Sequence, residues 1–249
     1  MSLLEVTDAS VRFGGLTAVD GLGFSVEAGE IVGLIGPNGA GKTTTFNMLV
    51  GLARAAEGTI RLDGRPLAGL RPHSIAALGM TKTFQNVSLF MESSVLDNVV
   101  TGALLREPLA EAKASARRVL ERVGLAGVAE RPAADLSFPE RARVEIARGL
   151  ATRPKILLLD EVMAALTPAE MEGIVALVRQ LRDEGITFVL IEHHMRAVMT
   201  LSDRILVLSF GRKIAEGRPE EVARDPKVIE AYLGREWAAE GAGPGQARP

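Results

Sequence analysis

The sequence predicts an α/β fold, in which a mixed sheet with antiparallel strands at its N-terminal end carries an inserted helical subdomain. Two observations support this prediction. Short aliphatic runs alternate with helix-period segments, a rhythm that favours largely parallel strands covered by helices. From about residue 95 to residue 150 that rhythm stops, and a stretch rich in Ala, Leu, Arg and Glu contains no run typical of a strand.

The composition of the 249-residue chain excludes several classes of protein. Its residues are 47% hydrophobic and 24% charged, which is enough to form a core and excludes global disorder. A formal net charge of −2 gives no overall attraction to nucleic acid. Because the chain has no cysteine, disulfides, zinc–cysteine sites, iron–sulfur clusters and thiol nucleophiles are excluded.

Neither a membrane span nor a signal peptide is expected. Apolar runs such as Ile31–Ile35 and Ile156–Leu159 are far shorter than the roughly 18–20 residues that cross a bilayer. The N-terminus has no basic segment followed by an apolar one. We therefore expect a soluble intracellular protein, whose association with a membrane would have to go through a protein partner.

The N-terminal third of the chain predicts strands separated by glycine-containing turns. One of them, Ile31–Ile35, is apolar on both faces, as a strand inside a sheet must be. It leads through a glycine-rich bend into a helix from about Lys42 to Leu49. The other strand candidates in this part are Leu4–Phe13, Gly23–Val26, Thr59–Leu62 and Met80–Phe84.

The inserted segment predicts two amphipathic helices, Ala110–Val123 and Pro139–Leu150. We assign residues 86–150 to a helical subdomain and residues 1–85 and 151–235 to the α/β core on either side of it. The Gly-, Ala- and Pro-rich stretch 236–249 is expected to be a flexible tail.

After the insert the alternation of strands and helices resumes. The helix Pro168–Arg182 has proline at its start and Gly185 after its end, the usual asymmetry of helix termini. The other expected elements are strands at Ile156–Leu159, Ile186–Ile191, Arg204–Leu208 and Lys213–Ala215 and helices at His194–Leu201 and Pro226–Leu233.

The glycine-rich bend is the strongest functional signal. It fits the pattern G-x-x-x-x-G-K-[ST] and lies between a buried strand and a helix, the context that this phosphate-binding loop (P-loop) requires. Glycines allow successive backbone N–H groups to point at phosphate oxygens, and the helix N-terminus adds a partial positive charge. Lys42 would reach the β- and γ-phosphates, and the Thr43 hydroxyl would bind Mg²⁺. The predicted nucleotide contacts are Gly36, Pro37, Asn38, Gly39, Ala40, Gly41, Lys42, Thr43 and Thr44.

A second signal is the acidic pair Asp160-Glu161, which ends the apolar run Ile156–Leu159. Open α/β sheets bind ligands at the carboxyl ends of their strands. Asp160 would hold Mg²⁺, directly or through water, and Glu161 would act as general base toward the attacking water. By itself such a pair also fits the start of a solvated loop, but together with a P-loop it predicts a P-loop NTPase core.

These motifs resemble those of ATP-binding-cassette (ABC) transporter ATPases over nearly the whole chain. The resemblance implies that the nucleotide is ATP. It also implies that Gln85 contacts Mg²⁺ and the attacking water, and that His193 is the histidine that contacts the γ-phosphate; His194 is the competing candidate. Phe13 occupies the position of the aromatic residue that stacks on adenine, and a place in the core is the alternative for it.

The family's signature loop, L-S-G-G-Q, corresponds here to the stretch from Leu136 to Glu140, with Phe and Pro in place of the two glycines. In the family this loop contacts the ATP held by a second ATPase subunit, so Ser137, Pro139 and Glu140 are expected to face the partner's ATP. Proline has no N–H to offer a γ-phosphate, and losing such a contact lowers the rate by roughly ten- to hundred-fold. Because a homodimer would carry this defect twice, a heterodimer is favoured.

Four stretches resemble more specifically the ATPase subunits of branched-chain amino-acid importers. The resemblance implies two transmembrane permease subunits, a periplasmic or extracellular substrate-binding protein, a place on the cytoplasmic face of the cell (inner) membrane, and no nucleic-acid partner. The alternatives are the ATPase of a lipid or lipopolysaccharide exporter and an ATP-sensing regulator with impaired hydrolysis. The four stretches are Phe13–Val19, Thr83–Asn86, Asp160–Ala164 and Val228–Gly234.

Overall fold

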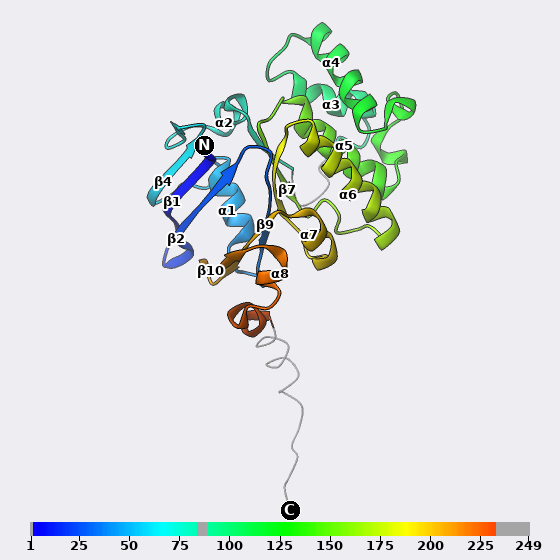
Figure 1. The fold of residues 1–249 in the computed structure, drawn as a ribbon. Helices are drawn as coiled ribbons and strands as arrows, with labels where there is room; N and C mark the ends of the chain where they lie inside the picture. The colour runs from blue at the N-terminus through cyan, green and yellow to red at the C-terminus, as the bar shows by residue number, and fades with distance from the viewer. Residues whose placement is uncertain (1, 84–88, 233–249) are drawn as a thin grey trace, which may run out of the picture.

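The computed structural model describes residues 2–83 and 89–232, which form two sheets with helices packed around them (Figure 1). The strands are β1 (Ser2–Phe13), β2 (Leu16–Glu27), β3 (Ile31–Ile35), β4 (Glu57–Leu62), β5 (Arg65–Pro66), β6 (Met80–Lys82), β7 (Ile156–Asp160), β8 (Thr187–Ile191), β9 (Arg204–Ser209) and β10 (Arg212–Gly217). The α-helices are α1 (Lys42–Leu49), α2 (Pro72–Leu78), α3 (Val95–Ala103), α4 (Leu109–Arg122), α5 (Phe138–Ala151), α6 (Pro168–Asp183), α7 (Met195–Leu201) and α8 (Pro219–Val222).

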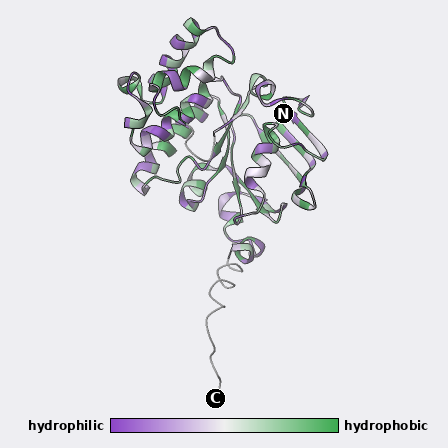
Figure 2. Ribbon diagram, turned by 180° about the vertical axis from the view of Figure 1, so that it is seen from behind, coloured by the Kyte–Doolittle hydropathy of each residue, from purple (hydrophilic) through white to green (hydrophobic). Residues whose placement is uncertain are grey.

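The larger sheet has the strand order β10-β9-β3-β8-β7-β6 within the described residues. Neighbouring strands from β9 to β6 are parallel, and β10 runs antiparallel to β9. Every residue of β3, β7 and β8 is buried, and all but Asp160 and Thr187 are apolar or glycine, so these strands form the hydrophobic centre of the molecule (Figure 2). The predicted α/β fold and its buried strands are confirmed.

The antiparallel N-terminal strands form a separate sheet in the order β2-β1-β4-β5. Its strands are longer than the sequence pattern indicated, most of all β2, which extends back from Gly23 to Leu16. The predicted strand was too short because Gly21 interrupts the alternation of apolar and polar residues. That glycine lies at a shift in the β1–β2 register, with a φ of +58° and its N–H donating to Ser10 Oγ at 2.9 Å. A glycine at a bulge lets the strand continue.

The two faces of the larger sheet bury two different cores. Val32 and Leu34 of β3 face the antiparallel sheet and α1, where Phe46 is fully buried. Ile31 and Ile35 face the opposite core, to which α3 to α7 contribute. The helices of the inserted segment therefore share one continuous core with the sheet, and they lie beside it in the upper part of Figure 1.

The predicted helices are found with small changes at their ends. They begin or end within about two residues of the expected positions, for α4, α5, α6 and α7 alike. Helix α2 was not predicted, because seven residues are too few to show a helical period. Strand β6 ends at Lys82, and Phe84, Gln85 and the stretch 236–249 lie outside the described residues.

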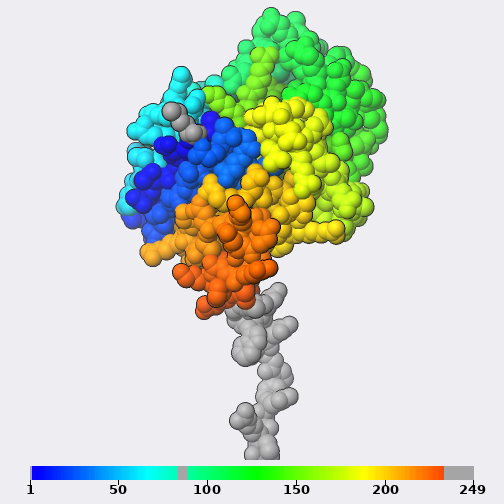
Figure 3. Space-filling model, in the orientation of Figure 1, coloured from blue at the N-terminus to red at the C-terminus, as the bar shows by residue number. Residues whose placement is uncertain are grey.

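A helix at 226–232 ends the described chain and lies at the lower end of the molecule, where it is the darkest orange segment (Figure 3). Its Tyr232 packs against the core on the helical side of the sheet. Within residues 2–83 and 89–232, no helix combines the length and the apolar character that crossing a bilayer demands.

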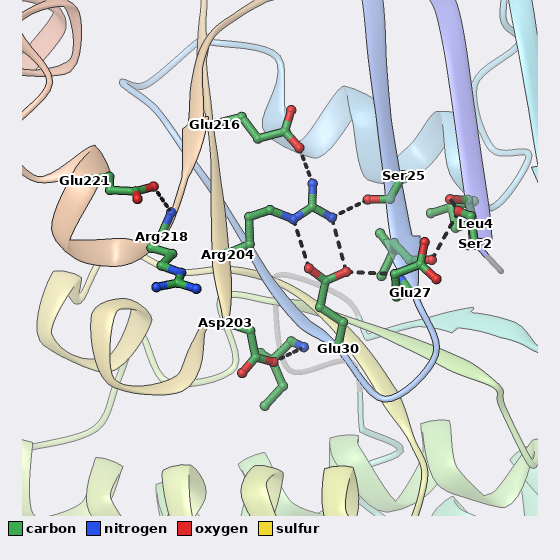
Figure 4. A network of polar contacts seen from close by, with 12 residues as sticks. Ser2, Leu4, Ser25, Glu27, Glu30, Asp203, Arg204, Glu216, Arg218 and Glu221 are labelled. Carbon is green, nitrogen blue, oxygen red and sulfur yellow. Dashed lines mark hydrogen bonds and ion pairs between the residues drawn. The ribbon is translucent and has the colours of Figure 1, made fainter.

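A polar network holds the start of β3 to its neighbours (Figure 4). The Arg204 guanidinium donates to both carboxylate oxygens of Glu30, at 2.9 and 3.1 Å, and to Ser25 O at 2.6 Å, and it also pairs with Glu216. The Glu30 hydrogen bond is the main reason why the pKa of Arg204 is raised. The network joins β2, β3, β9 and β10 at the end of β3 opposite the glycine-rich bend.

Replacing Arg204 by Met should lower the free energy of unfolding by about 2–3 kcal/mol, because Glu30 and the Ser25 carbonyl lose a charged donor in a half-buried place. Urea denaturation measures the change. Arg117→Met is the matched control, since the pair of Arg117 with Glu130 at 2.9 Å is exposed and should contribute less than about 0.5 kcal/mol. Equal losses in the two variants would contradict this account.

Candidate nucleotide-binding site

The glycine-rich bend connects β3 to α1 and closes around the side chain of Lys42. The ammonium group donates to Gly36 O at 2.7 Å and to Pro37 O at 3.2 Å, and the residue is only 7% exposed. Lys42 is also the first residue of α1, so the free N–H groups of the helix start lie beside it. The bend therefore concentrates positive charge at one place, as an anion site requires.

Two glycines in the bend are needed because other backbone comes too close for a side chain. A Cβ on Gly36, whose φ is +152°, would lie 2.1 Å from Leu208 O of β9. A Cβ on Gly41, whose φ is +101°, would lie 2.5 Å from Ala18 O of β2. Real Cβ atoms do not come so near to an oxygen, so both positions require glycine.

A cleft of about 640 Å³ opens beside the bend and brings together residues that are far apart in the sequence. It contains most of the predicted P-loop contacts, together with Glu161, His193 and Phe13. Gly36 and Pro37 do not line it; they lie behind the loop and hold Lys42 through their carbonyl groups. The lining residues are Phe13, Leu16, Thr17, Ala18, Asn38, Gly39, Ala40, Gly41, Lys42, Thr43, Thr44, Glu161, His193, Phe210 and Gly211.

Two exposed aromatic residues stand at this cleft. Phe13 is 55% exposed at the end of β1, so the alternative that placed it in the core is wrong. Phe210 is 81% exposed in the turn between β9 and β10, with a φ of +47°. Phe210 was not predicted as a site residue, because only the tertiary structure brings the turn between β9 and β10 to the cleft.

Asp160 ends β7 and is completely buried. Its N–H donates to Thr83 Oγ1 at 2.9 Å, and its Oδ2 is 3.4 Å from Lys82 Nζ. Burial raises the pKa of Asp160, and the nearby Lys82 ammonium opposes that rise. The other oxygen, Oδ1, accepts no hydrogen bond from the described part of the chain.

This donor set fits Mg²⁺. Asp160 has a buried carboxylate oxygen with unused acceptor capacity, and the Thr43 hydroxyl lies in the cleft. Magnesium prefers a few hard oxygen ligands from the protein and takes the rest from phosphate and water. No group of three or more His, Cys, Asp or Glu residues suited to a metal occurs among residues 2–83 and 89–232. Such a set is unnecessary when phosphate oxygens complete the coordination.

Lys82 is a site residue that the sequence analysis missed. It is the last residue of β6, its side chain is 7% exposed, and its Nζ donates to Asn47 Oδ1 of α1 at 2.9 Å. The sequence feature that could have indicated Lys82 is its place in a short strand directly before the segment of Gln85. Gln85 itself lies outside the described residues.

Glu161 and His193 meet at the cleft, although 32 positions separate them in the chain. His193 Nε2 donates to Glu161 Oε1 at 2.8 Å. Glu161 has a φ of +55°, a conformation that raises the energy of a non-glycine residue by about 1–2 kcal/mol. Its N–H donates to Ile191 O at 2.9 Å, which ties this strained residue to the end of β8. His194 does not line the cleft; its carbonyl accepts N–H groups at the start of α7.

Glu192, between Ile191 and His193, is a second buried carboxyl group near the cleft and is 2% exposed. Its Oε1 accepts the N–H of Met163 at 2.9 Å. The pKa of Glu192 is raised to about 7, mainly by burial and also by the neighbouring carboxylates of Glu161 and Asp160, while hydrogen bonds from the backbone N–H groups of Met163 and His193 act in the opposite direction.

The predicted signature residues do not line the chain's own cleft. Ser137 precedes α5, and its N–H and hydroxyl both donate to Glu140 Oε2, at 2.8 and 2.7 Å. The hydroxyl bond is the main cause of the lowered pKa of Glu140. Pro139 lies in the first turn of α5, where a missing N–H is tolerated. Phe138 is 59% exposed beside this helix start.

The C-terminal helical turn contacts the back of the phosphate loop. Burial raises the pKa of Tyr232, whose hydroxyl shares a hydrogen bond with the backbone of Gly36. Tyr232 belongs to the stretch Val228–Gly234 that the sequence analysis singled out, and the structure brings it to the first residue of the P-loop.

The phosphate loop connects the parallel strand β3 to helix α1. The buried Asp160 ends β7, which is separated from β3 in the sheet by β8 alone. This arrangement defines a P-loop nucleotide-binding domain. The comparisons with known proteins define the family more closely. Residues 19–164 match the family described as ABC transporter, and residues 212–238 match the family described as branched-chain amino acid ATP-binding cassette transporter. The chain belongs to the ABC transporter family, as one of its ATP-hydrolysing ATP-binding subunits.

Relatives and solved structures agree with this assignment. The chain is 43% identical over 249 positions to the high-affinity branched-chain amino acid transport ATP-binding protein BraF of Pseudomonas aeruginosa, covering 93% of this chain and 98% of BraF. It is 34% identical over 239 positions to the lipopolysaccharide export system ATP-binding protein LptB of Haemophilus influenzae, covering 95% and 99%. A crystal structure of the ADP conformation of an ABC-transporter cassette superposes with a TM-score of 0.86 at 32% identity, covering 94% and 99%.

Gly41→Ala should destabilise the fold by more than about 2 kcal/mol and weaken ATP binding at least about ten-fold, because the new Cβ would push β2 away from the loop. Gly39→Ala is the control. Its φ of +79° is equally unsuited to alanine, yet a Cβ there has no neighbour within 4 Å in the described part of the chain. Gly39→Ala should therefore lower the free energy of unfolding by only about 1 kcal/mol. Urea denaturation and titration with a fluorescent ATP analogue measure both variants, and identical behaviour would refute the packing argument.

Proposed function

We propose that this chain is the ATP-binding and hydrolysing subunit of an importer for branched-chain amino acids. The single observation that carries hydrolysis is the contact of 2.8 Å between His193 and Glu161 in the cleft of the phosphate loop. A general base oriented by a histidine serves hydrolysis, whereas an ATP sensor does not need it. The proposal therefore favours an active ATPase over a regulator with impaired hydrolysis.

The importer is favoured over a lipid or lipopolysaccharide exporter by two similarities. The chain is more similar to the branched-chain transport protein BraF, at 43% identity, than to the lipopolysaccharide export protein LptB, at 34%. The C-terminal match at residues 212–238 is to the branched-chain family and contains Tyr232, which contacts the phosphate loop.

In the proposed reaction, Lys42 exchanges its bonds to Gly36 O and Pro37 O for bonds to the β- and γ-phosphates. Thr43 and Asp160 would hold Mg²⁺, which would supply positive charge to neutralise the phosphate oxygens. Glu161 accepts a proton from the attacking water, and His193 keeps the carboxylate oriented and contacts the γ-phosphate.

Phe13 stacks on adenine from the rim of the cleft. Gln85, which lies outside the described residues, is proposed to complete the magnesium site.

We propose a second ATPase subunit as partner and favour a heterodimer. Ser137, Pro139 and Glu140 lie outside the chain's own cleft, which agrees with a role at a partner's ATP. Residues 86–150 would act as the subdomain that presents them. Pro139 offers no N–H to that ATP, so a partner whose own signature loop has glycines would leave one of the two sites complete.

Two permease subunits would hold the ATPase pair on the cytoplasmic face of the membrane, and a substrate-binding protein outside would deliver the amino acid. Copurification of the tagged chain with the products of its neighbouring genes tests this assembly. Recovery of two permeases and a second ATPase in stoichiometric amounts would support the proposal. Recovery of lipopolysaccharide-export components would instead show that the chain is an exporter ATPase.

Glu161→Gln should leave ATP binding intact and lower turnover by roughly 10²- to 10⁴-fold, because the amide cannot accept the proton of water. Lys42→Ala should instead weaken ATP binding itself, since it removes the ammonium group from the loop. Nucleotide titration and phosphate release in the reconstituted complex separate the two effects. Undiminished hydrolysis in either variant would overturn the assignment.

His193→Ala should reduce kcat by about 10²-fold and weaken ATP binding by a smaller factor, since the imidazole orients the general base and contacts the γ-phosphate. His194→Ala is the matched control one residue away and should change kcat less than about three-fold, because its side chain does not line the cleft. Steady-state phosphate release gives both values. A larger loss in the His194 variant would reverse the assignment of the two histidines.

A further inference from the structure

The turn that follows Glu161 and the segment that carries His193 are joined at a second point besides the contact between those two side chains. The connection is Glu192, which directly precedes His193. Its Oε1 accepts the N–H of Met163, two residues after Glu161, at 2.9 Å. Both residues are almost completely buried, at 2% and 0% exposure, so this bond is shielded from water.

The position of this bond makes it a mechanical constraint on the cleft. Glu161 has a φ of +55° and is held on one side by its N–H bond to Ile191 O. On its other side, the chain is held at Met163 by Glu192. The segments of Glu161 and His193 are thus fastened to each other both before and after the strained residue.

The carboxyl group of Glu192 is expensive to bury, so its retention needs a reason. Its second oxygen, Oε2, is buried and has no hydrogen-bond partner in the part of the chain that the structure describes. The negative charges of Glu161 and Asp160 both oppose the ionisation of Glu192. The bond to Met163 needs only an acceptor at Oε1, which the group supplies in either protonation state.

We propose that Glu192 is a positioning residue for ATP hydrolysis: by accepting the Met163 N–H it holds the turn after Glu161 against the His193 segment, and so keeps the general base and the histidine in contact. This inference rests on the proposed ATP hydrolysis. It concerns turnover and not nucleotide binding, because Glu192 does not line the cleft of the phosphate loop.

Three variants of the full chain, assembled with its transporter partners, separate the acceptor from the charge. Glu192→Leu removes the acceptor and leaves the Met163 N–H unpaired, and Glu192→Asp keeps the carboxyl group but shortens its reach by one methylene. Both should lower kcat by about ten-fold or more. Glu192→Gln keeps an acceptor at the same length and should stay within about three-fold of the natural protein. ATP affinity, measured with a fluorescent analogue, should change less than two-fold in all three.

Glu30→Gln provides a control for stability alone, since Glu30 lies in the Arg204 network at the opposite end of β3. It should lower the unfolding midpoint while leaving kcat unchanged. If Glu192→Leu does not fold, the pair of Asp and Gln variants still decides the question. Equal kcat values in those two, or a fall in ATP affinity parallel to kcat, would overturn the positioning role. Absence of hydrolysis in the natural protein would instead refute the proposed function and is distinguishable from both.

Discussion

The nucleotide cleft depends on the close approach of backbone to backbone at the two ends of the phosphate loop. Gly36 lies against Leu208 of β9 and Gly41 against Ala18 of β2, at distances that leave no room for a Cβ. These contacts place the start of α1 directly over the end of β3. The N–H groups at the helix start and the Lys42 ammonium consequently point to one place, where they favour a polyphosphate.

The second constraint is the burial of charge where parallel strands end together. Lys82 ends β6, Asp160 ends β7, and Glu192 follows the end of β8. In this poorly solvated place the pKa values of both carboxyl groups are raised, and Lys82 opposes the effect at Asp160. Charge interactions are strong where water is excluded, so a bound nucleotide with its metal would change the balance among these groups.

In the signature segment, by contrast, the hydrogen bonds that hold the start of α5 are made within the segment itself. Ser137 and Glu140 satisfy each other at the start of α5, and Pro139 fits the first turn without distortion. Replacing the family's glycines therefore leaves the helix intact while changing what the loop offers to a second subunit. Under the proposed function, evolution of this surface would alter the partner's site without affecting the fold of the chain.

The phosphate loop, the acidic pair at the end of β7 and the long helices could be predicted from the amino-acid sequence, because each is encoded by neighbouring residues. A glycine pattern specifies its own backbone, and an apolar run ending in Asp160 specifies a buried strand with a polar end. Which strand ends lie together became visible only in the folded chain, which places Lys82 and Glu192 near Asp160 and Glu161. The physical reason is that strand order and side-chain burial arise from contacts between distant segments, and no local spacing records them.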